Sequence, residues 1–122
     1  MTTVLVIEDN AANLTLATFL LESVGHTVLA ARDAEAGLTL ARDKQPNLIL
    51  MDIQLPGMDG LEATAMLKRD PATRAIPVIA LTAFAMKGDE ERILAAGCDG
   101  YIAKPMRYKD FLREIAARLG PS

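Results

Sequence analysis

The sequence predicts an α/β fold in which a parallel sheet carries helices on both faces. Strand-sized apolar runs alternate with segments of helical spacing, and turn-forming residues separate them. A parallel connection needs a crossover helix, and strands lying between two helical layers are apolar on both sides. The 122 residues, 51% hydrophobic and 24% charged, are typical of one domain that buries a real core.

Five runs rich in leucine or β-branched residues have the length of strands. They are residues 3–7 (TVLVI), 27–31 (TVLAA), 47–51 (NLILM), 76–81 (IPVIAL) and 100–103 (GYIA). Because helical segments lie between them, we expect five strand–helix units in a single sheet.

The segments between the runs carry apolar residues at the spacing of a core-facing helix. The stripes are Leu14, Ala17, Leu21 and Val24; Ala34, Gly37, Leu38 and Ala41; and Tyr108, Phe111, Leu112, Ile115 and Leu119. Gly25 and Gly97 stand where the first and fourth helices should end, and Asp33 stands where a helix should be capped. Pro46, Pro71 and Pro77 fall between elements, as expected of residues that interrupt regular structure.

Charge and cysteine content exclude several classes of function. The net charge is -3 and no basic cluster is present, which argues against direct nucleic-acid binding. Cys98 is the only cysteine, so no intrachain disulfide can form, and we expect it to be a small buried residue. The opening MTTVLVIEDN has no basic region, and its acids interrupt the apolar run, so neither a signal peptide nor membrane insertion is expected. We expect a cytoplasmic protein.

Polar side chains follow four of the five predicted strands. They are Glu8 and Asp9, Asp52, Thr82, and Lys104 followed by Pro105. In an open α/β sheet the carboxyl ends of the strands form the usual site. Three close carboxylates would raise one another's pKa unless a cation joined them. Mg²⁺ prefers such oxygen ligands, while Lys104 and Thr82 suit phosphoryl oxygens.

Each of these residues also has a simpler interpretation when it is taken alone. Glu8 and Asp9 suit the start of a helix, and Asp52 suits a turn. Thr82 suits a helix cap, and Lys104 suits an exposed surface. The order acid, acid, hydroxyl and ammonium at successive strand ends favours a shared site over separate turn residues.

At these residues the sequence resembles the receiver domain of two-component response regulators. The resemblance covers almost the whole chain, through VLVIEDN, LILMDIQLPGMDG, VIALTA and GYIAKP. It looks especially close to stand-alone receivers of the DivK type, and receivers fused to hybrid histidine kinases look similar too. The resemblance implies a doubly wound, flavodoxin-like sheet of order 2-1-3-4-5.

The resemblance also implies the chemistry of the site. Asp52 would accept a phosphoryl group from a phosphohistidine. Glu8, Asp9, Asp52 and the backbone carbonyl of Gln54 would hold Mg²⁺ directly or through water, and Lys104 would bind a phosphoryl oxygen. Glu8 stands where many members have Asp, which favours contact through water, and the Gln54 side chain would influence the lifetime of the acyl phosphate.

Further implications concern the switch and the output surface. Thr82 would move toward the phosphate, Tyr101 would turn inward, and the bond before Pro105 would be cis; the alternative for Tyr101 is an ordinary half-buried strand residue. Ala83 would leave the site accessible. The output face would be formed by the fourth helix, fifth strand and fifth helix, including Met86, Lys87, Tyr101 and Met106.

These features predict a phosphoacceptor rather than a turnover enzyme, with a histidine kinase or histidine phosphotransfer protein as donor and another protein as output partner. Only Gly120, Pro121 and Ser122 follow the last predicted helix, so residues 1–122 are expected to form one receiver without an output domain. A segment of a hybrid histidine kinase remains an alternative. A haloacid-dehalogenase-like phosphatase fits less well, because Gln54 stands where that family has a second Asp. A flavin-binding module would need a phosphate loop where Glu8 and Asp9 stand, and an unphosphorylated scaffold would not need these site residues.

Overall fold

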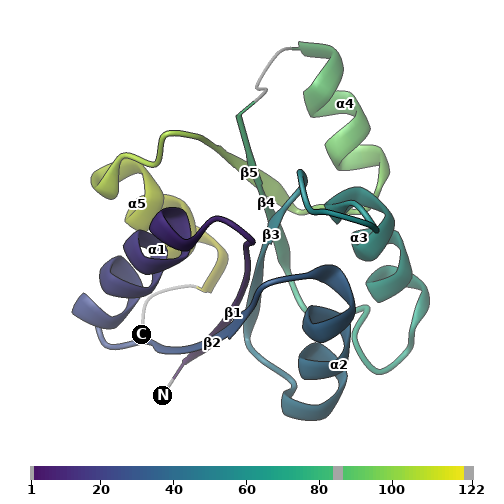
Figure 1. Ribbon diagram of the computed structural model, residues 1–122, viewed down its shortest axis with the longest axis horizontal. Helices are drawn as coiled ribbons and strands as arrows, with labels where there is room; N and C mark the ends of the chain where they lie inside the picture. Colours follow the sequence, from purple (N-terminus) through teal and green to yellow (C-terminus); the bar gives the residue numbers. More distant parts are fainter. Residues whose placement is uncertain (1, 84–86, 120–122) are drawn as a thin grey trace.

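The fold is a parallel sheet of five strands between two layers of helices, as the computed structural model, which describes residues 2–83 and 87–119, shows (Figure 1). The strands are β1 (Thr3–Ile7), β2 (Thr27–Ala31), β3 (Leu48–Asp52), β4 (Val78–Thr82) and β5 (Gly100–Ala103). Their order is β2-β1-β3-β4-β5, and every pair is parallel. The predicted fold class and strand order are confirmed.

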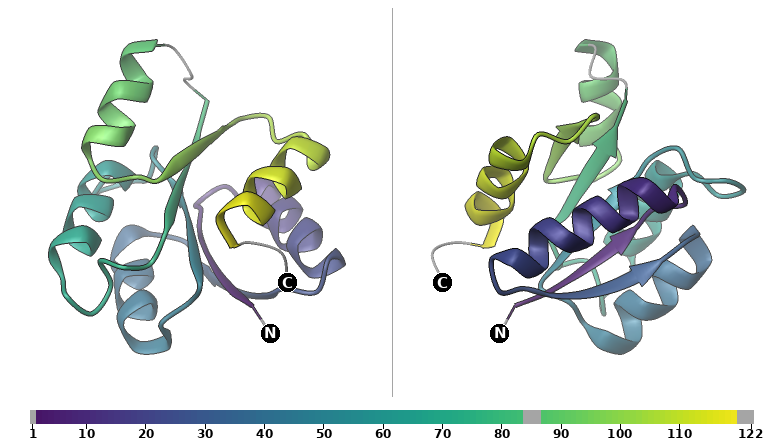
Figure 2. Two further views of the ribbon diagram at one scale, coloured as in Figure 1. Left: turned by 180° about the vertical axis from the view of Figure 1, so that it is seen from behind. Right: turned by 60° about the vertical axis from the view of Figure 1, so that its left-hand side comes forward.

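Five helices cover the two faces of the sheet. They are α1 (Ala11–Ser23), α2 (Ala34–Lys44), α3 (Gly60–Arg69), α4 (Lys87–Ala95) and α5 (Tyr108–Leu119). Helices α1 and α5 lie on one face, and α2, α3 and α4 lie on the other (Figures 1 and 2). None of the helices in the described ranges is both long and apolar enough to cross a membrane.

Alternate strand residues supply two separate cores, because successive side chains of a strand point to opposite faces. In β1, Val4 and Val6 join the core beneath α1 and α5, while Leu5 and Ile7 join the core on the other face. Both faces are buried, which explains why the strands are apolar throughout. Cys98 is buried in the second of these cores, as expected.

Two strand boundaries differ from the prediction in a way that matters for the site. Strand β3 extends to Asp52, and β4 runs over Val78–Thr82 rather than residues 76–81. Ile76 donates its N–H to the Thr73 carbonyl in a turn, and Pro77 has no N–H to donate, so β4 begins after them. Asp52 and Thr82 are therefore the last residues of their strands rather than loop residues.

The helix punctuation was predicted correctly, but two stripe positions were wrong. Gly25 and Gly97 have φ values of 93° and 108°, and Asp33 caps α2 by accepting from the Ala36 N–H at 2.8 Å. Val24, however, is 52% exposed as the C-cap of α1, and Tyr108 is 57% exposed as the first residue of α5. Both residues lie at helix ends, which extend beyond the part of the helix that packs on the core.

The start of α3 packs directly against the end of β3. Asp59 caps this helix by accepting from the Glu62 N–H at 2.8 Å. A Cβ atom on Gly60 would lie 2.3 Å from the Asp52 carbonyl oxygen and 2.6 Å from the Ile53 Cα. Because both contacts are with backbone, only glycine fits here without moving the strand end that carries Asp52.

We predict that Gly60→Ala lowers the free energy of unfolding by about 2–3 kcal/mol, through overpacking against rigid backbone. Gly88→Ala is the matched control, because a Cβ there meets no atom within 4 Å and alanine favours a helix by up to about 1 kcal/mol. Urea unfolding followed by circular dichroism measures both. Equal stability of Gly60→Ala and wild type would contradict the close approach.

Candidate functional site

Three carboxylates from two adjacent strand ends meet at one edge of the sheet. One oxygen atom from each of Glu8, Asp9 and Asp52 lies within 4.8 Å of the others. Glu8 and Asp9 follow β1, and Asp52 ends β3, which pairs directly with β1. Glu8 and Asp52 are buried, whereas Asp9 is half-buried. The predicted acidic cluster is thus present.

Lys104, which follows β5, extends its ammonium group into this cluster. Its Nζ lies 3.0 Å from Glu8 Oε1 and 3.2 Å from Asp52 Oδ2. The Lys104 N–H donates to the Thr82 carbonyl at 2.7 Å, which fixes the residue beside β4. The peptide bond between Lys104 and Pro105 is cis, as predicted. Lys104 is therefore an internal partner of the carboxylates and not a surface lysine.

Asp52 is held at both of its carboxylate oxygens. Oδ1 accepts from the Gln54 N–H at 2.9 Å, while Oδ2 pairs with Lys104. Gln54 and Asp9 line an open depression above the carboxylate together with Asn10, Ala11, Asn13, Ala83 and Lys104. The Asp52 carboxylate is thus fixed in direction and faces a space that another molecule can enter.

The pKa values of the two buried acids, Glu8 and Asp52, are shifted in opposite directions. Burial, reinforced by a hydrogen bond to Asp52, raises the pKa of Glu8 to about 7, although Lys104 and Asn13 favour its charged form. Burial alone would also raise the pKa of Asp52, but hydrogen bonds from Glu8 and the Gln54 N–H, together with Lys104, lower it below its usual value. Asp52 therefore carries its charge most readily, as a nucleophile or a metal ligand requires.

The donor set fits a divalent cation with oxygen ligands. Within the described ranges, Glu8 Oε2 is fully buried and has no hydrogen-bond partner. A cation beside this oxygen would satisfy it and would favour the ionised form of Glu8. Carboxylate oxygens facing an accessible depression that admits water suit Mg²⁺, which usually retains several waters.

The predicted switch residues differ in exposure and in position along their strands. Thr82 is fully buried at the end of β4, while Ala83 is exposed beside it. Tyr101 is half-buried, and its hydroxyl donates a hydrogen bond to Glu90 of α4. This hydrogen bond is the main cause of the raised pKa of Tyr101.

The predicted output face is corrected at one position. Met106 is buried in the core beneath α1 and α5, so it does not belong to a surface. Met86 and the side chain of Lys87 lie outside the described residues. Tyr101 is half-buried on β5, which lies between α4 and α5 along the chain.

An apolar surface on α1 adjoins the acidic edge. Leu16 is 38% exposed and Phe19 is 67% exposed, and both line a shallow apolar depression together with Ala11, Ala12 and Thr15. Ala11 also borders the depression above Asp52. Leu20, which also lies on α1, is buried.

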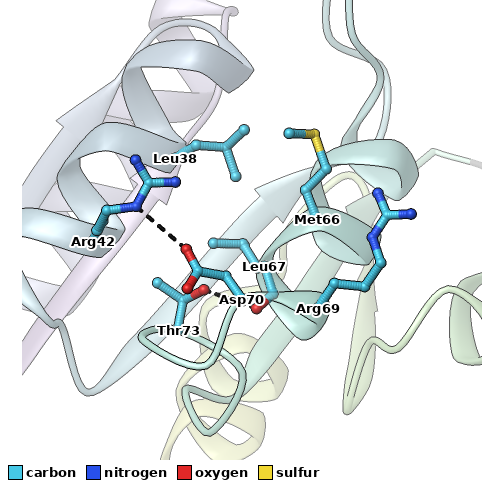
Figure 3. Close-up of a pocket in the computed structure, with 7 residues that line it drawn as sticks. All are labelled: Leu38, Arg42, Met66, Leu67, Arg69, Asp70 and Thr73. Atoms are coloured by element: carbon cyan, nitrogen blue, oxygen red, sulfur yellow. Dashed lines mark hydrogen bonds and ion pairs between the residues drawn. The ribbon is translucent and has the colours of Figure 1, made fainter.

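A second depression, of about 310 Å³, lies between α2 and α3 away from these strand ends. Figure 3 shows Arg42 of α2 reaching across it to Asp70, with Leu38 and Leu67 nearby. Arg42 Nε lies 3.3 Å from Asp70 Oδ2, and the same carboxylate accepts from the Ala72 N–H at 2.9 Å. These polar groups are used to join two helices and to cap a turn.

Arg32, which follows β2, is a further residue beside the site that was not predicted from the sequence. Its Nη2 atom donates to the Asp9 carbonyl at 2.8 Å. The same reasoning from strand ends would have included it, because β2 ends beside β1.

We predict that the metal-free protein loses stability as pH rises from about 5 to about 8. The pKa of Glu8 in the folded protein, about 7, exceeds the ordinary value of 4.5 that applies in the unfolded chain. The folded state therefore binds a proton more tightly at low pH, and the stability gained in this way is lost as Glu8 deprotonates. The loss over this range is on the order of 2–3 kcal/mol. The lowered pKa of Asp52 affects stability only at more acidic pH, where this carboxylate becomes protonated. Urea unfolding in EDTA at several pH values measures the effect.

Glu8→Gln is the control, because its amide cannot titrate, and its stability should vary less over this range. Wild-type stability that stays level or increases between these pH values would contradict the protonated Glu8.

Comparison with known proteins identifies the family. The model of the response regulator receiver domain matches residues 4–116. The chain is 50% identical over 117 residues to the polar-differentiation response regulator DivK of Brucella anthropi, covering 96% of this chain and 95% of that protein. DivK of Brucella ovis matches with the same identity and coverage.

Solved structures of two other proteins have the same fold as this chain. The receiver domain of the sensor histidine kinase PA1611 from Pseudomonas aeruginosa superposes with a TM-score of 0.91 at 35% identity, over 98% of both chains. That structure has a magnesium ion coordinated in its active-site cleft. The chemotaxis response regulator CheY4 of Vibrio cholerae, at 23% identity, shares the fold with a TM-score of 0.93 over 98% of this chain and 99% of that one. The chain, which spans nearly the whole length of its DivK relatives, belongs to the response regulator receiver domain family.

Proposed function

We propose that the protein accepts a phosphoryl group on Asp52 from a phosphohistidine of a histidine kinase or a histidine phosphotransfer protein. The observation that carries the proposal is the setting of the Asp52 carboxylate: it is held at both oxygens and opens to a depression, and Lys104 and the Gln54 N–H help to lower its pKa. Membership of the receiver family supports it.

In the proposed reaction an Asp52 oxygen attacks phosphorus, and a P–O bond forms as the P–N bond to the donor imidazole breaks. Lys104 already lies 3.2 Å from Asp52 Oδ2, so its ammonium group is placed to neutralise charge on the phosphoryl group. Phosphoryl transfer depends mainly on such positioning and charge stabilisation. The fixed strand end supplies the positioning.

Glu8, Asp9, Asp52 and the Gln54 carbonyl are the proposed ligands of Mg²⁺. Bound Mg²⁺ would neutralise the acids and allow the anionic phosphoryl group to approach. The orphaned Glu8 Oε2 and the acidic cluster support this assignment. The magnesium ion in the PA1611 receiver, a relative at 35% identity, supports it as well.

A phosphoacceptor is favoured over a turnover phosphatase of the haloacid-dehalogenase type. Such an enzyme has a second Asp two residues after its nucleophile, whereas Gln54 occupies that position and contributes its N–H to Asp52. We therefore propose slow loss of the protein's own acyl phosphate and no turnover of phosphate monoesters.

The signal would pass to another protein through the surface formed by α4, β5 and α5. A phosphoryl group on Asp52 would attract Lys104 and Thr82 and thereby bias the conformation of this surface, including Tyr101. We propose a cytoplasmic, stand-alone receiver like the DivK relatives, whose length the chain nearly spans. The alternative is the receiver of a hybrid histidine kinase, in which the output would be in the same chain.

The phosphodonor is proposed to dock on the apolar surface of α1 defined by Leu16 and Phe19. This surface borders the Asp52 depression through Ala11, so a partner seated on it would bring its histidine close to Asp52. Exposed apolar side chains gathered in one patch are typical of protein interfaces.

We predict a single Mg²⁺-dependent phosphoryl adduct when the protein is incubated with acetyl phosphate, measured as intact mass. Asp52→Ala and an EDTA control should show no adduct, because the acceptor or the cation is then missing. If the wild type gains no adduct with acetyl phosphate, phosphoramidate or a phosphorylated histidine donor, the phosphotransfer proposal fails.

We predict that Phe19→Ala slows phosphotransfer from a histidine kinase by roughly tenfold, the loss of one buried aromatic contact at an interface. The donor is the kinase of the source organism that phosphorylates the wild type fastest in a phosphotransfer profile. Phosphorylation by acetyl phosphate should be unchanged, because a small donor needs no docking surface.

Leu94→Ala is the control for this experiment, since Leu94 is 54% exposed on α4, outside the α1 surface. Equal slowing by Phe19→Ala and Leu94→Ala, or slowing with acetyl phosphate as well, would argue against docking on α1.

A further inference from the structure

The loop between β1 and α1 carries two of the three site carboxylates and is anchored on both sides of Asp9. The Glu8 N–H donates to the Ala31 carbonyl at 3.0 Å, and the Asn10 side chain accepts from the Asn13 N–H at 2.9 Å. Across residues 2–83 and 87–119, the Asp9 carboxylate makes no hydrogen bond or ion pair. Its direction therefore depends on how its own backbone is held.

Arg32 provides that backbone contact from the neighbouring strand. Arg32 follows Ala31, the last residue of β2, which pairs with Ile7 of β1. Its Nη2 atom donates to the Asp9 carbonyl at 2.8 Å. A hydrogen bond from a charged donor is stronger than a neutral one, and the guanidinium plane fixes its direction.

We infer that Arg32 is a positioning residue for the metal site: its hydrogen bond to the Asp9 carbonyl directs the Asp9 carboxylate toward Glu8 and Asp52. The inference rests on the proposed function, because it concerns Mg²⁺ at these carboxylates. Arg32 does not line the depression above Asp52, so it acts through Asp9. Residues that orient ligands in this way contribute substantially to metal affinity.

Two effects of Arg32 on Mg²⁺ binding have opposite signs, which makes the inference testable. As a positive charge near the site, Arg32 repels a cation, so removing the charge would tighten Mg²⁺ binding. As the group that directs Asp9, Arg32 supports binding, so removing it would weaken Mg²⁺ binding. If Arg32 contributes only its charge, its removal should tighten Mg²⁺ binding. If it positions Asp9, its removal should weaken Mg²⁺ binding.

The test is isothermal titration of Mg²⁺ into metal-free wild type, Arg32→Gln, Arg32→Lys and Arg42→Gln, above the pKa of Glu8. Arg32→Gln should raise the Kd for Mg²⁺ by roughly threefold to tenfold. Arg32→Lys, which keeps the charge and a donor, should lose less. Arg42→Gln removes the same charge from the exposed pair with Asp70, away from the site, and should leave the Kd within about twofold of wild type.

Urea unfolding of the metal-free variants separates a local effect from misfolding, since both arginines are exposed and neither change should shift stability by more than about 1 kcal/mol. Unchanged or tighter Mg²⁺ binding by Arg32→Gln, with normal binding by the wild type, overturns the inference and leaves the proposed function intact. Weakening matched by Arg42→Gln also overturns it. If the wild type itself binds no Mg²⁺, the proposed metal site fails, and this inference fails with it.

Discussion

The site depends on one ammonium group that holds two buried carboxylates together. Glu8, Asp9 and Asp52 would place three negative charges within 4.8 Å, and Lys104 offsets only one of them. The remaining charge imbalance is relieved by retaining a proton on Glu8, whose pKa is about 7, or by binding a cation. The metal-free site is therefore electrostatically incomplete, and this incompleteness supports the proposed binding of a divalent ion and then of an anionic phosphoryl group.

The sheet makes this costly arrangement possible by fixing the backbone around it. β1 and β3 are adjacent, so Glu8 and Asp52 are delivered side by side, while β4 and β5 bring Lys104 from the other end of the chain. The close packing of Gly60 against the Asp52 carbonyl fixes the position of the end of β3. Asp52 lies at the end of a buried strand, so the core fixes its position while the turn that follows leaves its oxygens accessible.

The features that follow from strand order could be predicted from the sequence. Parallel strands end at a shared edge, so the residues that follow each run were enough to predict that Glu8, Asp9, Asp52 and Lys104 lie together. The errors concern details that depend on tertiary packing. Met106, which the family resemblance placed on the output face, lies between β5 and α5 and is buried in the core beneath α1 and α5. The hydrogen bond from Tyr101 to Glu90 joins β5 to α4, and no sequence pattern indicates it. The bond from Arg32 to the Asp9 carbonyl joins the ends of two paired strands, so strand order alone would have indicated it.

The central claim is that Asp52 is the phosphoacceptor, and chemical trapping tests it most directly. Borohydride reduces an aspartyl phosphate to homoserine, so protein treated with acetyl phosphate and Mg²⁺, reduced and digested, can be analysed by peptide mass spectrometry. The account predicts homoserine at position 52, dependent on both acetyl phosphate and Mg²⁺. Homoserine at another aspartate, with position 52 unchanged, would contradict it.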